Sequence, residues 1–360
     1  MSEIESGLYA INVKHMVEML SKAYVSLIET KTPFKTFPSV MLWGPPGVGK
    51  SQGVREIASV IAETTGKKVV ITDVRLLLFN PVDLRGIPTA NEDKTLAVWL
   101  KPKIFQMDDS DETVNILFLD EISAAPPSVQ SAAYQITLDR MVGEHKLPEN
   151  CIVIAAGNRV TDKSVAYNMP KALANRLCHF EIKGDAKAWH DWAVKNGVHR
   201  YVVSYLEYSA GALMRFDSSG TNLAFATPRS WEMASNILNT ISEDIDEVYP
   251  MIIGCISHNT ASNLKSWVEL FKTMPSMKDI LAGKITDEPK APELQIVLRA
   301  EMVHYVRKHP TQEVLDATID FACKLPWAFR GKLMHDYSCI PELKVLLQNN
   351  DVYKTAMENA

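Results

Sequence analysis

The sequence predicts an α/β domain, with a parallel sheet covered by helices on both faces, followed by helical regions. Short apolar runs recur between residues 38 and 184, separated by stretches long enough for helices, as in parallel sheets buried on both faces. Residues 186–272 and 294–360 instead have helical patterns, with a proline-containing connector between them. We therefore expect four parts: residues 1–37, 38–184, 185–273 and 274–360.

Hydrophobic periodicity defines the expected elements. Apolar residues between Ile11 and Ile28 recur with a period near 3.6, which predicts an amphipathic helix over residues 11–30. In the last region we expect Trp327, Phe329 and Tyr337 to lie in the core. The Gly/Ser-rich segment 216–222 predicts a loop. Five apolar runs predict strands: residues 40–43, 69–71, 116–119, 152–156 and 179–182.

Composition excludes several classes of protein. The chain has 360 residues and a net charge of −5, which argues against a nucleic-acid coat protein or a polybasic membrane binder. Five cysteines without a Cys-x-x-Cys pair indicate free thiols in a reducing compartment, and the histidines lack metal-ligand spacing. No apolar run is long enough to span a membrane, and the first residues lack the apolar segment of a secretory signal. We expect a cytoplasmic protein.

A phosphate-binding motif follows the first predicted strand. Residues 44–51, Gly-Pro-Pro-Gly-Val-Gly-Lys-Ser, match G-x-x-x-x-G-K-[ST] in full, and a helical stretch begins at Gln52. The glycines let backbone N–H groups close around an anion, and the helix N-terminus adds its positive dipole end. Lys50 would reach the β- and γ-phosphates, and the Ser51 hydroxyl would bind Mg²⁺. A chance glycine-rich turn is the weaker alternative, because the strand–loop–helix context is complete.

Two carboxylates follow the third predicted strand. Asp120 and Glu121 come directly after residues 116–119, and ligands of parallel sheets lie at the carboxyl ends of strands. Asp120 is therefore expected near the same Mg²⁺ as Ser51, and Glu121 is expected to polarise the attacking water. A solvated strand end would be the better interpretation of an isolated Asp-Glu pair, but the upstream phosphate motif favours catalysis.

Three later polar residues are candidates for the same chemistry. Asn158 ends the strand at 152–156 and could hold the lytic water or the γ-phosphate; a turn-forming Asn is the alternative. Arg176 precedes the fifth strand and could reach the γ-phosphate of a neighbouring subunit, although most arginines are solvated. Arg229 lies in the first turn of a helix that begins at Pro228. A cation is unfavourable at the positive end of the helix dipole, so we expect either a bound anion or a surface ion pair to compensate it.

In this order the residues resemble AAA+ ATPases over about residues 38–270, and the stretches 73–75, 81–88 and 227–231 resemble the MoxR-like branch. The resemblance implies a P-loop NTPase core, a helical lid over residues 185–273, and hydrolysis of ATP with Mg²⁺ held by Ser51 and Asp120. It assigns catalysis to Lys50, Glu121, Asn158, Arg229 and, in trans, Arg176. It implies these ATP-binding residues: Gly44, Pro45, Pro46, Gly47, Val48, Gly49, Lys50, Ser51, Gln52 and Asp120.

Assembly and partners are also implied by the resemblance. Such ATPases are ring homo-oligomers, commonly hexamers, that act on a protein client or a metal-enzyme complex, and a von Willebrand factor A-domain protein is the expected adaptor. Two hairpins that face the pore or client are expected at residues 85–100 and 140–148. One alternative is a nucleic-acid motor, since basic residues such as Lys94 and Lys101 lie near the hairpins. Another is an ATP-binding switch or scaffold with little turnover, for which Glu121 and Arg176 would be unnecessary.

Overall fold

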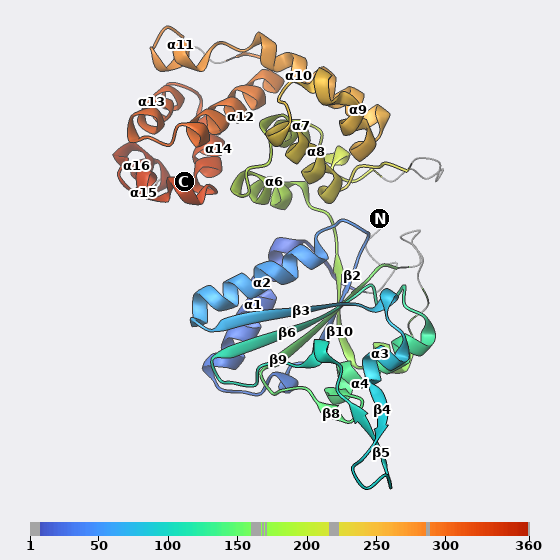
Figure 1. Cartoon of the computed structure of the whole chain (residues 1–360). Helices are drawn as coiled ribbons and strands as arrows, with labels where there is room; N and C mark the ends of the chain where they lie inside the picture. The colour runs from blue at the N-terminus through green and yellow to red at the C-terminus, as the bar shows by residue number, and fades with distance from the viewer. Residues whose placement is uncertain are drawn as a thin grey trace. The chain divides into compact units, whose positions relative to one another are not determined.

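The computed structural model describes residues 8–159, 167, 169, 171–215, 223–285 and 289–358. By its internal contacts the chain divides into two compact units, Met1–Lys183 and Gly184–Ala360 (Figure 1). The first is an α/β unit and the second is helical. The loop expected at residues 216–222 lies outside the described part of the chain.

The first unit contains a six-stranded sheet in the order β1-β10-β2-β9-β6-β3, and every neighbouring pair is parallel. Five of the strands contain the five predicted apolar runs, which confirms those predictions. The sixth, β1, has two residues and is too short to carry a sequence pattern. The strands are β1 (Ala10–Ile11), β2 (Ser39–Trp43), β3 (Lys68–Arg75), β6 (Thr113–Asp120), β9 (Cys151–Gly157) and β10 (Leu177–Ile182).

Helices cover both faces of this sheet. Helices α1 and α2 lie together on one face, and α3 and α4 lie on the other (Figure 1). Alternate residues of the central strands, such as Leu117 and Val153, pack with Val129 and Ala133 of α4, because successive strand residues point to opposite faces. The helices of this unit are α1 (Val13–Glu29), α2 (Lys50–Thr65), α3 (Pro81–Arg85), α4 (Pro127–Asp139) and α5 (Lys171–Ala174).

The predicted N-terminal helix is confirmed as α1, and it packs closely against α2. Asn12 caps it by accepting a hydrogen bond from the His15 N–H at 2.8 Å. Gly53 of α2 faces Met16 and Val13, and a Cβ at residue 53 would clash with Met16 Cε and lie 3.1 Å from Val13 Cγ1. The absence of a side chain at Gly53 therefore allows the two helices to approach, directly behind the phosphate motif.

Two short hairpins extend from the first unit, as predicted. Strands β4 (Ile87–Ala90) and β5 (Ala97–Leu100) pair antiparallel, as do β7 (Met141–Val142) and β8 (His145–Lys146). A hydrogen bond of 2.8 Å joins His145 Nε2 to the Trp99 carbonyl oxygen, so the two hairpins are in contact. Their proximity could not be predicted from the sequence, because more than forty residues separate them.

The second unit has two hydrophobic cores. One gathers Trp231, Ile252 and Leu264, and the other gathers Met302, Leu333 and other residues of the last helices. The helices are α6 (Ala186–Lys195), α7 (Arg200–Tyr208), α8 (Pro228–Thr240), α9 (Ile245–Ile256), α10 (His258–Val268), α11 (Met277–Leu281), α12 (Pro292–Lys308), α13 (Gln312–Cys323), α14 (Trp327–Ser338), α15 (Lys344–Gln348) and α16 (Asp351–Glu358).

One core prediction in this unit is wrong. Phe329 and Tyr337 are buried, but Trp327 is 78% exposed. Helical phase does not explain the difference, because the buried Met334 lies seven positions after Trp327 and so on nearly the same face of α14. Trp327 is instead the first residue of α14, directly after Pro326, and its place at the helix end, which a count of aromatic residues does not report, accounts for the error.

The cysteine prediction is confirmed, because all five cysteines are free thiols. Burial raises the pKa of the Cys151 thiol to about 12, which keeps it protonated and unreactive. Across the described ranges, no helix combines the length and apolar character needed to cross a bilayer.

Candidate active site

The phosphate motif forms a loop between β2 and α2. The strand ends at Trp43 and the helix begins at Lys50, as the sequence predicts. Gly44, Gly47 and Gly49 all have positive φ. At Gly44, φ is 155° and a Cβ would lie 2.5 Å from the Ile182 carbonyl oxygen, so a larger residue could not occupy this turn. The loop therefore has the backbone shape that an anion cradle needs, followed directly by a helix N-terminus.

Lys50 links the loop to the end of a neighbouring strand. Its ammonium group is buried and donates hydrogen bonds to three uncharged oxygens: Gly44 O at 2.5 Å, Pro45 O at 3.1 Å and Asn158 Oδ1 at 2.9 Å. The structure thus brings together two predicted site residues, Lys50 and Asn158, that are 108 positions apart. An ammonium group binds phosphate oxygens more strongly than these neutral oxygens, so an anion entering the loop can replace them.

Ser51 and Asp120 also come together. The Ser51 hydroxyl donates to Asp120 Oδ2 at 3.1 Å, and the other carboxylate oxygen accepts from the Glu121 N–H at 2.9 Å. A hydroxyl and a carboxylate oxygen are hard oxygen ligands of the kind that Mg²⁺ takes, and one or two protein ligands beside substrate phosphates are usual for this ion. The residues present therefore fit the predicted metal.

Glu121 adopts a strained backbone conformation at the end of β6. Its φ is 58°, in the left-handed region, which costs a non-glycine residue roughly 1–2 kcal/mol. The turn around it is fixed by hydrogen bonds from Ala124 N to Glu121 O and from Ile122 N to Ala156 O, both 3.0 Å. Such strain concentrates at functional sites, and here it falls on the residue expected to activate water.

Ser123 is a supporting residue that the sequence reasoning missed. Its buried hydroxyl accepts a hydrogen bond of 2.9 Å from the Asn158 N–H. Gly157 lies against it, since a Cβ at residue 157 would be 2.7 Å from Ser123 Oγ. This contact fixes the backbone that carries Asn158. A serine two residues beyond an acidic pair has no distinctive sequence signal.

Asp73, which the sequence analysis named only within the stretch 73–75 and gave no task, lies near the end of the adjacent strand β3. Burial raises the pKa of its carboxyl group, and the negative charge of Asp120 raises it further, while Arg75 and Arg55 oppose the shift. The register of β3 and β6 places residue 73 beside Phe118, two positions before Asp120. The carboxyl ends of these strands therefore concentrate negative charge where a divalent cation would be stabilised.

Arg176 lies at the amino ends of the parallel strands, whereas the phosphate loop lies at their carboxyl ends. It is exposed and directly precedes β10, whose first residue, Leu177, pairs with Ser39 at the start of β2. The phosphate loop instead follows the last residue of β2, Trp43. At about 3.3 Å per residue, the length of β2 separates the two ends by roughly 16 Å. Arg176 is thus not brought to the phosphate loop of its own chain.

Arg229 belongs to the second unit. It is exposed and lies in the first turn of α8, after Thr227 and Pro228, which confirms the helix start expected there. Thr227 and Ser230 form a reciprocal cap, with the Ser230 N–H donating to Thr227 Oγ1 at 3.1 Å. The cap fixes the turn that carries the guanidinium group.

Residues 39–179 match the family described as "ATPase family associated with various cellular activities (AAA)". This segment is therefore similar in sequence to AAA ATPase domains. It runs from the start of β2 into β10, so it contains the phosphate loop, Asp120, Glu121, Asn158 and Arg176.

Comparisons of the whole chain add little to the AAA domain assignment. No curated protein matches the sequence significantly. Among solved structures, a RuvB mutant from Thermotoga maritima is 13% identical, with a TM-score of 0.35, over 97% of this chain and 88% of that one. PCH-2 from C. elegans is 13% identical, with a TM-score of 0.34, over 71% of this chain and 68% of that one. These low values support no inference on activity, ligand or assembly.

Proposed function

We propose that this chain is a magnesium-dependent ATPase of the AAA+ class, in the MoxR-like branch, which works as a ring homo-oligomer, such as a hexamer, to remodel a protein client. The observation that supports the proposal most strongly is the pair of contacts at the phosphate loop, Lys50 with Asn158 and Ser51 with Asp120. Both lie inside the segment that matches the AAA family.

Each residue of the site has a proposed task. The backbone of residues 44–52 would hold the phosphates, with Lys50 exchanging its present uncharged acceptors for phosphate oxygens. Ser51 and Asp120 would bind Mg²⁺, which neutralises phosphate charge when bound. Glu121 would accept a proton from the attacking water, and Asn158 would orient that water or the γ-phosphate.

The ring assembly is proposed from the position of Arg176. Its exposed side chain lies at the amino ends of the strands, away from the phosphate loop of its own chain. It therefore suits a role at the nucleotide of an adjacent subunit, where an arginine stabilises the charge that develops on the phosphoryl group. We propose that Arg229 contacts the nucleotide from the helical lid in the same cycle. Its place in the first turn of α8 makes a compensating anion favourable.

The first hairpin supports a protein client. Ile87, Leu96 and Leu100 are 63%, 68% and 57% exposed, and exposed apolar side chains gathered on one hairpin are typical of protein contacts. Lys94 and Lys101 also lie at this hairpin, but the interleaved acidic residues Glu92 and Asp93 would oppose the binding of nucleic acid there. We therefore prefer a protein client, reached through a von Willebrand factor A-domain adaptor as in the MoxR-like resemblance, over a nucleic-acid motor.

A subunit-mixing experiment tests the shared active site. Lys50→Ala subunits should not bind ATP, and Arg176→Ala subunits should bind ATP without turnover. Mixed rings should recover part of the ATPase rate, because an intact Arg176 from one variant can serve an intact phosphate loop of the other. The rate is measured by phosphate release, and assembly of each variant by light scattering.

Glu121→Gln provides the matched control for chemistry. It should bind ATP and assemble but release no phosphate, since the amide cannot accept the proton of the attacking water. If the variants assemble and the mixture shows no recovery, the shared-site proposal is wrong. If wild-type rings hydrolyse ATP only at background rate, the ATPase proposal fails and the switch alternative takes its place.

A further inference from the structure

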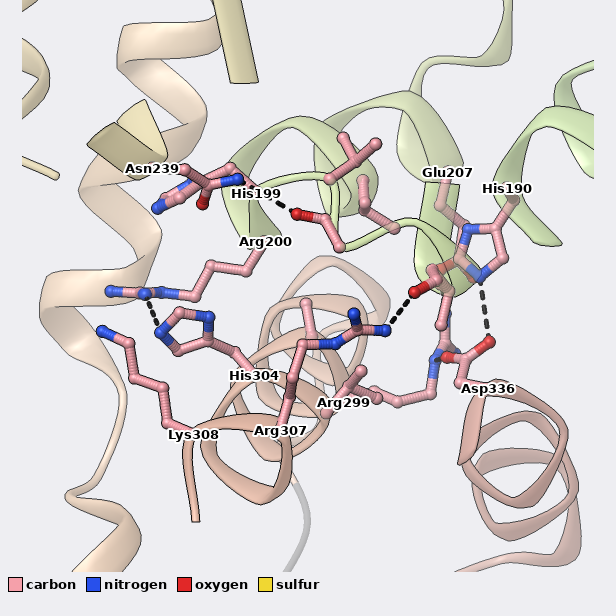
Figure 2. Close-up of a pocket in the computed structure, with 16 residues that line it drawn as sticks. His190, His199, Arg200, Glu207, Asn239, Arg299, His304, Arg307, Lys308 and Asp336 are labelled. Atoms are coloured by element: carbon pink, nitrogen blue, oxygen red, sulfur yellow. Dashed lines mark hydrogen bonds and ion pairs between the residues drawn. The ribbon is translucent and has the colours of Figure 1, made fainter. Parts of the chain in front are cut away.

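The second unit contains a cavity of about 270 Å³ that no part of the proposed ATPase cycle uses. It lies between α7 and α12, with contributions from α6, α8 and α14, and we call it the α7–α12 pocket (Figure 2). Its wall is divided by chemistry. Val194, Val198, Val203 and Val303 provide apolar surface, whereas cationic and histidine side chains provide most of the polar surface.

His199 is one of the residues that line the pocket, and it has a buried donor. The residue is 1% exposed, and its Nδ1 accepts a hydrogen bond of 3.3 Å from the Tyr201 N–H. The proton of the neutral ring is therefore on Nε2. Within the described ranges, Nε2 has no hydrogen-bond partner. A buried donor without an acceptor costs about 1–3 kcal/mol, so a ligand that accepts this hydrogen bond would be favoured.

Arg307 differs from the other cations of the pocket. Arg299 lies between two carboxylates, with its Nε 2.9 Å from Asp336 Oδ2 and its Nη2 against Glu207. Arg307 donates to the Val194 carbonyl oxygen, and no described carboxylate lies within ion-pair distance of it. Figure 2 shows its side chain between the group of Arg200, His304 and Lys308 and the group of His190 and Asp336. The charge of Glu342 acts on Arg307 from beyond ion-pair distance and does not outweigh burial, which lowers the pKa of the guanidinium group. A partly buried guanidinium group without a carboxylate in direct contact can bind an anion strongly.

Carboxylates compensate the charges of the other cations in the pocket, which leaves Arg307 as the cation best able to bind an anion. Arg200 Nη2 lies 2.9 Å from Glu243 Oε2, and Arg200 Nε lies 2.9 Å from Glu301 Oε2. Lys308 Nζ lies 2.6 Å from Glu243 Oε1. Burial, and then the charge of Arg200, lower the pKa of His199 to about 3 and that of His304 to about 4. Both rings are therefore neutral at pH 7 and act as hydrogen-bonding groups in a region of positive potential.

We propose that the α7–α12 pocket binds a small phosphate monoester, with the phosphate group bound by Arg307 and the His199 Nε2–H, and an apolar body packed against the valines. A phosphate carries up to two charges and three acceptor oxygens, which suits a guanidinium fork and a second donor. The cavity is larger than one phosphate group, and its apolar wall would be left uncovered by an inorganic ion.

Calorimetric titration of the full-length chain tests this site separately from the phosphate loop. The probe is phenyl phosphate, and the titrations use the Lys50→Ala protein, in which the loop no longer competes for phosphate. We expect one binding event per chain, at least tenfold weaker after Arg307→Gln and after His199→Phe. Inorganic phosphate and benzoate should each bind at least fivefold more weakly than phenyl phosphate, because one lacks the apolar body and the other the second charge.

Arg330→Gln is the matched control, because Arg330 lies on α14 of the same unit outside the pocket lining and its loss should change the affinity less than twofold. Circular dichroism would establish that each variant is folded, and Arg307→Lys, which keeps the charge, should retain part of the affinity. Absence of binding in the Lys50→Ala protein, or unchanged affinity in folded Arg307→Gln and His199→Phe proteins, would overturn the proposal. Equal affinity for inorganic phosphate would overturn the role of the valines. None of these results depends on ATP hydrolysis.

Discussion

Two buried cations, Lys50 in the phosphate loop and Arg299 in the second unit, show how the nature of the partner separates a binding group from a structural one. Lys50 donates to three uncharged oxygens, which a phosphate can replace. Arg299 is held by the carboxylates of Asp336 and Glu207, which leave no gain for a further anion. Arg307 lines the same pocket as Arg299. It resembles Lys50 in having an uncharged acceptor, the Val194 carbonyl oxygen. The charge of the partner is thus more informative than the burial of the cation.

The largest expected effect tests the Lys50 side of this comparison. Lys50→Ala should weaken MgATP binding at least about 100-fold and reduce turnover to background, because one cation that contacts transferring phosphate is worth several kcal/mol. Fluorescent-nucleotide titration measures the first effect and phosphate release the second. Lys22→Ala, an exposed position on α1, is the control and should leave both unchanged. Retained tight binding by folded Lys50→Ala protein would contradict the site.

The Arg299 side predicts a loss of stability instead. Burial opposes ionisation of Asp336, but the hydrogen bond from His190 and the charge of Arg299 outweigh it and hold its pKa below the ordinary value. Asp336→Asn would leave Arg299 poorly compensated, and we expect the unfolding free energy of the second unit to fall by about 3–5 kcal/mol. Urea denaturation measures this change. Asp351→Asn, at an exposed ion pair with Lys354, should cost less than about 0.5 kcal/mol, and equal losses would refute the distinction.

Acid should lower the stability of the protein through the two neutral histidines of the pocket. The pKa values of His199 and His304, about 3 and about 4, lie below the ordinary 6.5, so their contribution to stability is complete above pH 6.5 and decreases as the pH falls. Between pH 7 and pH 5 we expect the unfolding free energy to fall by roughly 2 kcal/mol per histidine. The doubly substituted His199→Gln, His304→Gln protein should lack this slope.

The difference between these two proteins isolates the histidines from Glu301, whose pKa is raised chiefly by burial and which therefore acts in the opposite direction. His15→Gln, at an exposed position on α1, is the control and should keep the slope of the wild-type protein. Identical slopes in the wild-type and doubly substituted proteins would show that the imidazoles are not held neutral.

The smallest effect concerns the strained backbone of Glu121. Glu121→Gly and Glu121→Ala should both abolish turnover, but the glycine variant should be more stable than the alanine variant by about 1 kcal/mol, because only glycine relieves the positive φ. Thermal denaturation of the two proteins measures the difference. A more stable alanine variant would show that the turn relaxes when the carboxylate is removed.

The sequence predicted the phosphate loop well because its signal is contiguous. The motif at residues 44–51 and the acidic pair at 120–121 follow apolar strands, and parallel pairing brings their carboxyl ends to one edge. The contact of Lys50 with Asn158 follows from the same geometry once the strand order is known. Ser123 was missed, and Asp73 was noted only as part of a family-like stretch, because each acts through a neighbour.

The α7–α12 pocket could not be predicted from the sequence in the same way. Its polar residues come from positions 190 to 336, spread over several helices, and no local spacing relates His199 to Arg307. Periodicity predicts which face of a helix is buried. It does not predict whether a cation on that helix contacts solvent, a carboxylate or a cavity, because that depends on how the helices pack. Trp327 shows the same limit, since Leu325 and Phe329, two positions away on either side, lie in the core while Trp327 is exposed.

The close fit of Gly53 against Met16 gives the first helix an influence beyond its own stability. A methyl group at residue 53 would force the Met16 side chain to move and would crowd Val13, and α2 begins at Lys50, only three positions earlier. The same N-terminal segment contributes β1, which pairs with the strand that follows Arg176. The segment of residues 10–29 is therefore in contact both with the helix that begins at Lys50 and with the strand that follows Arg176.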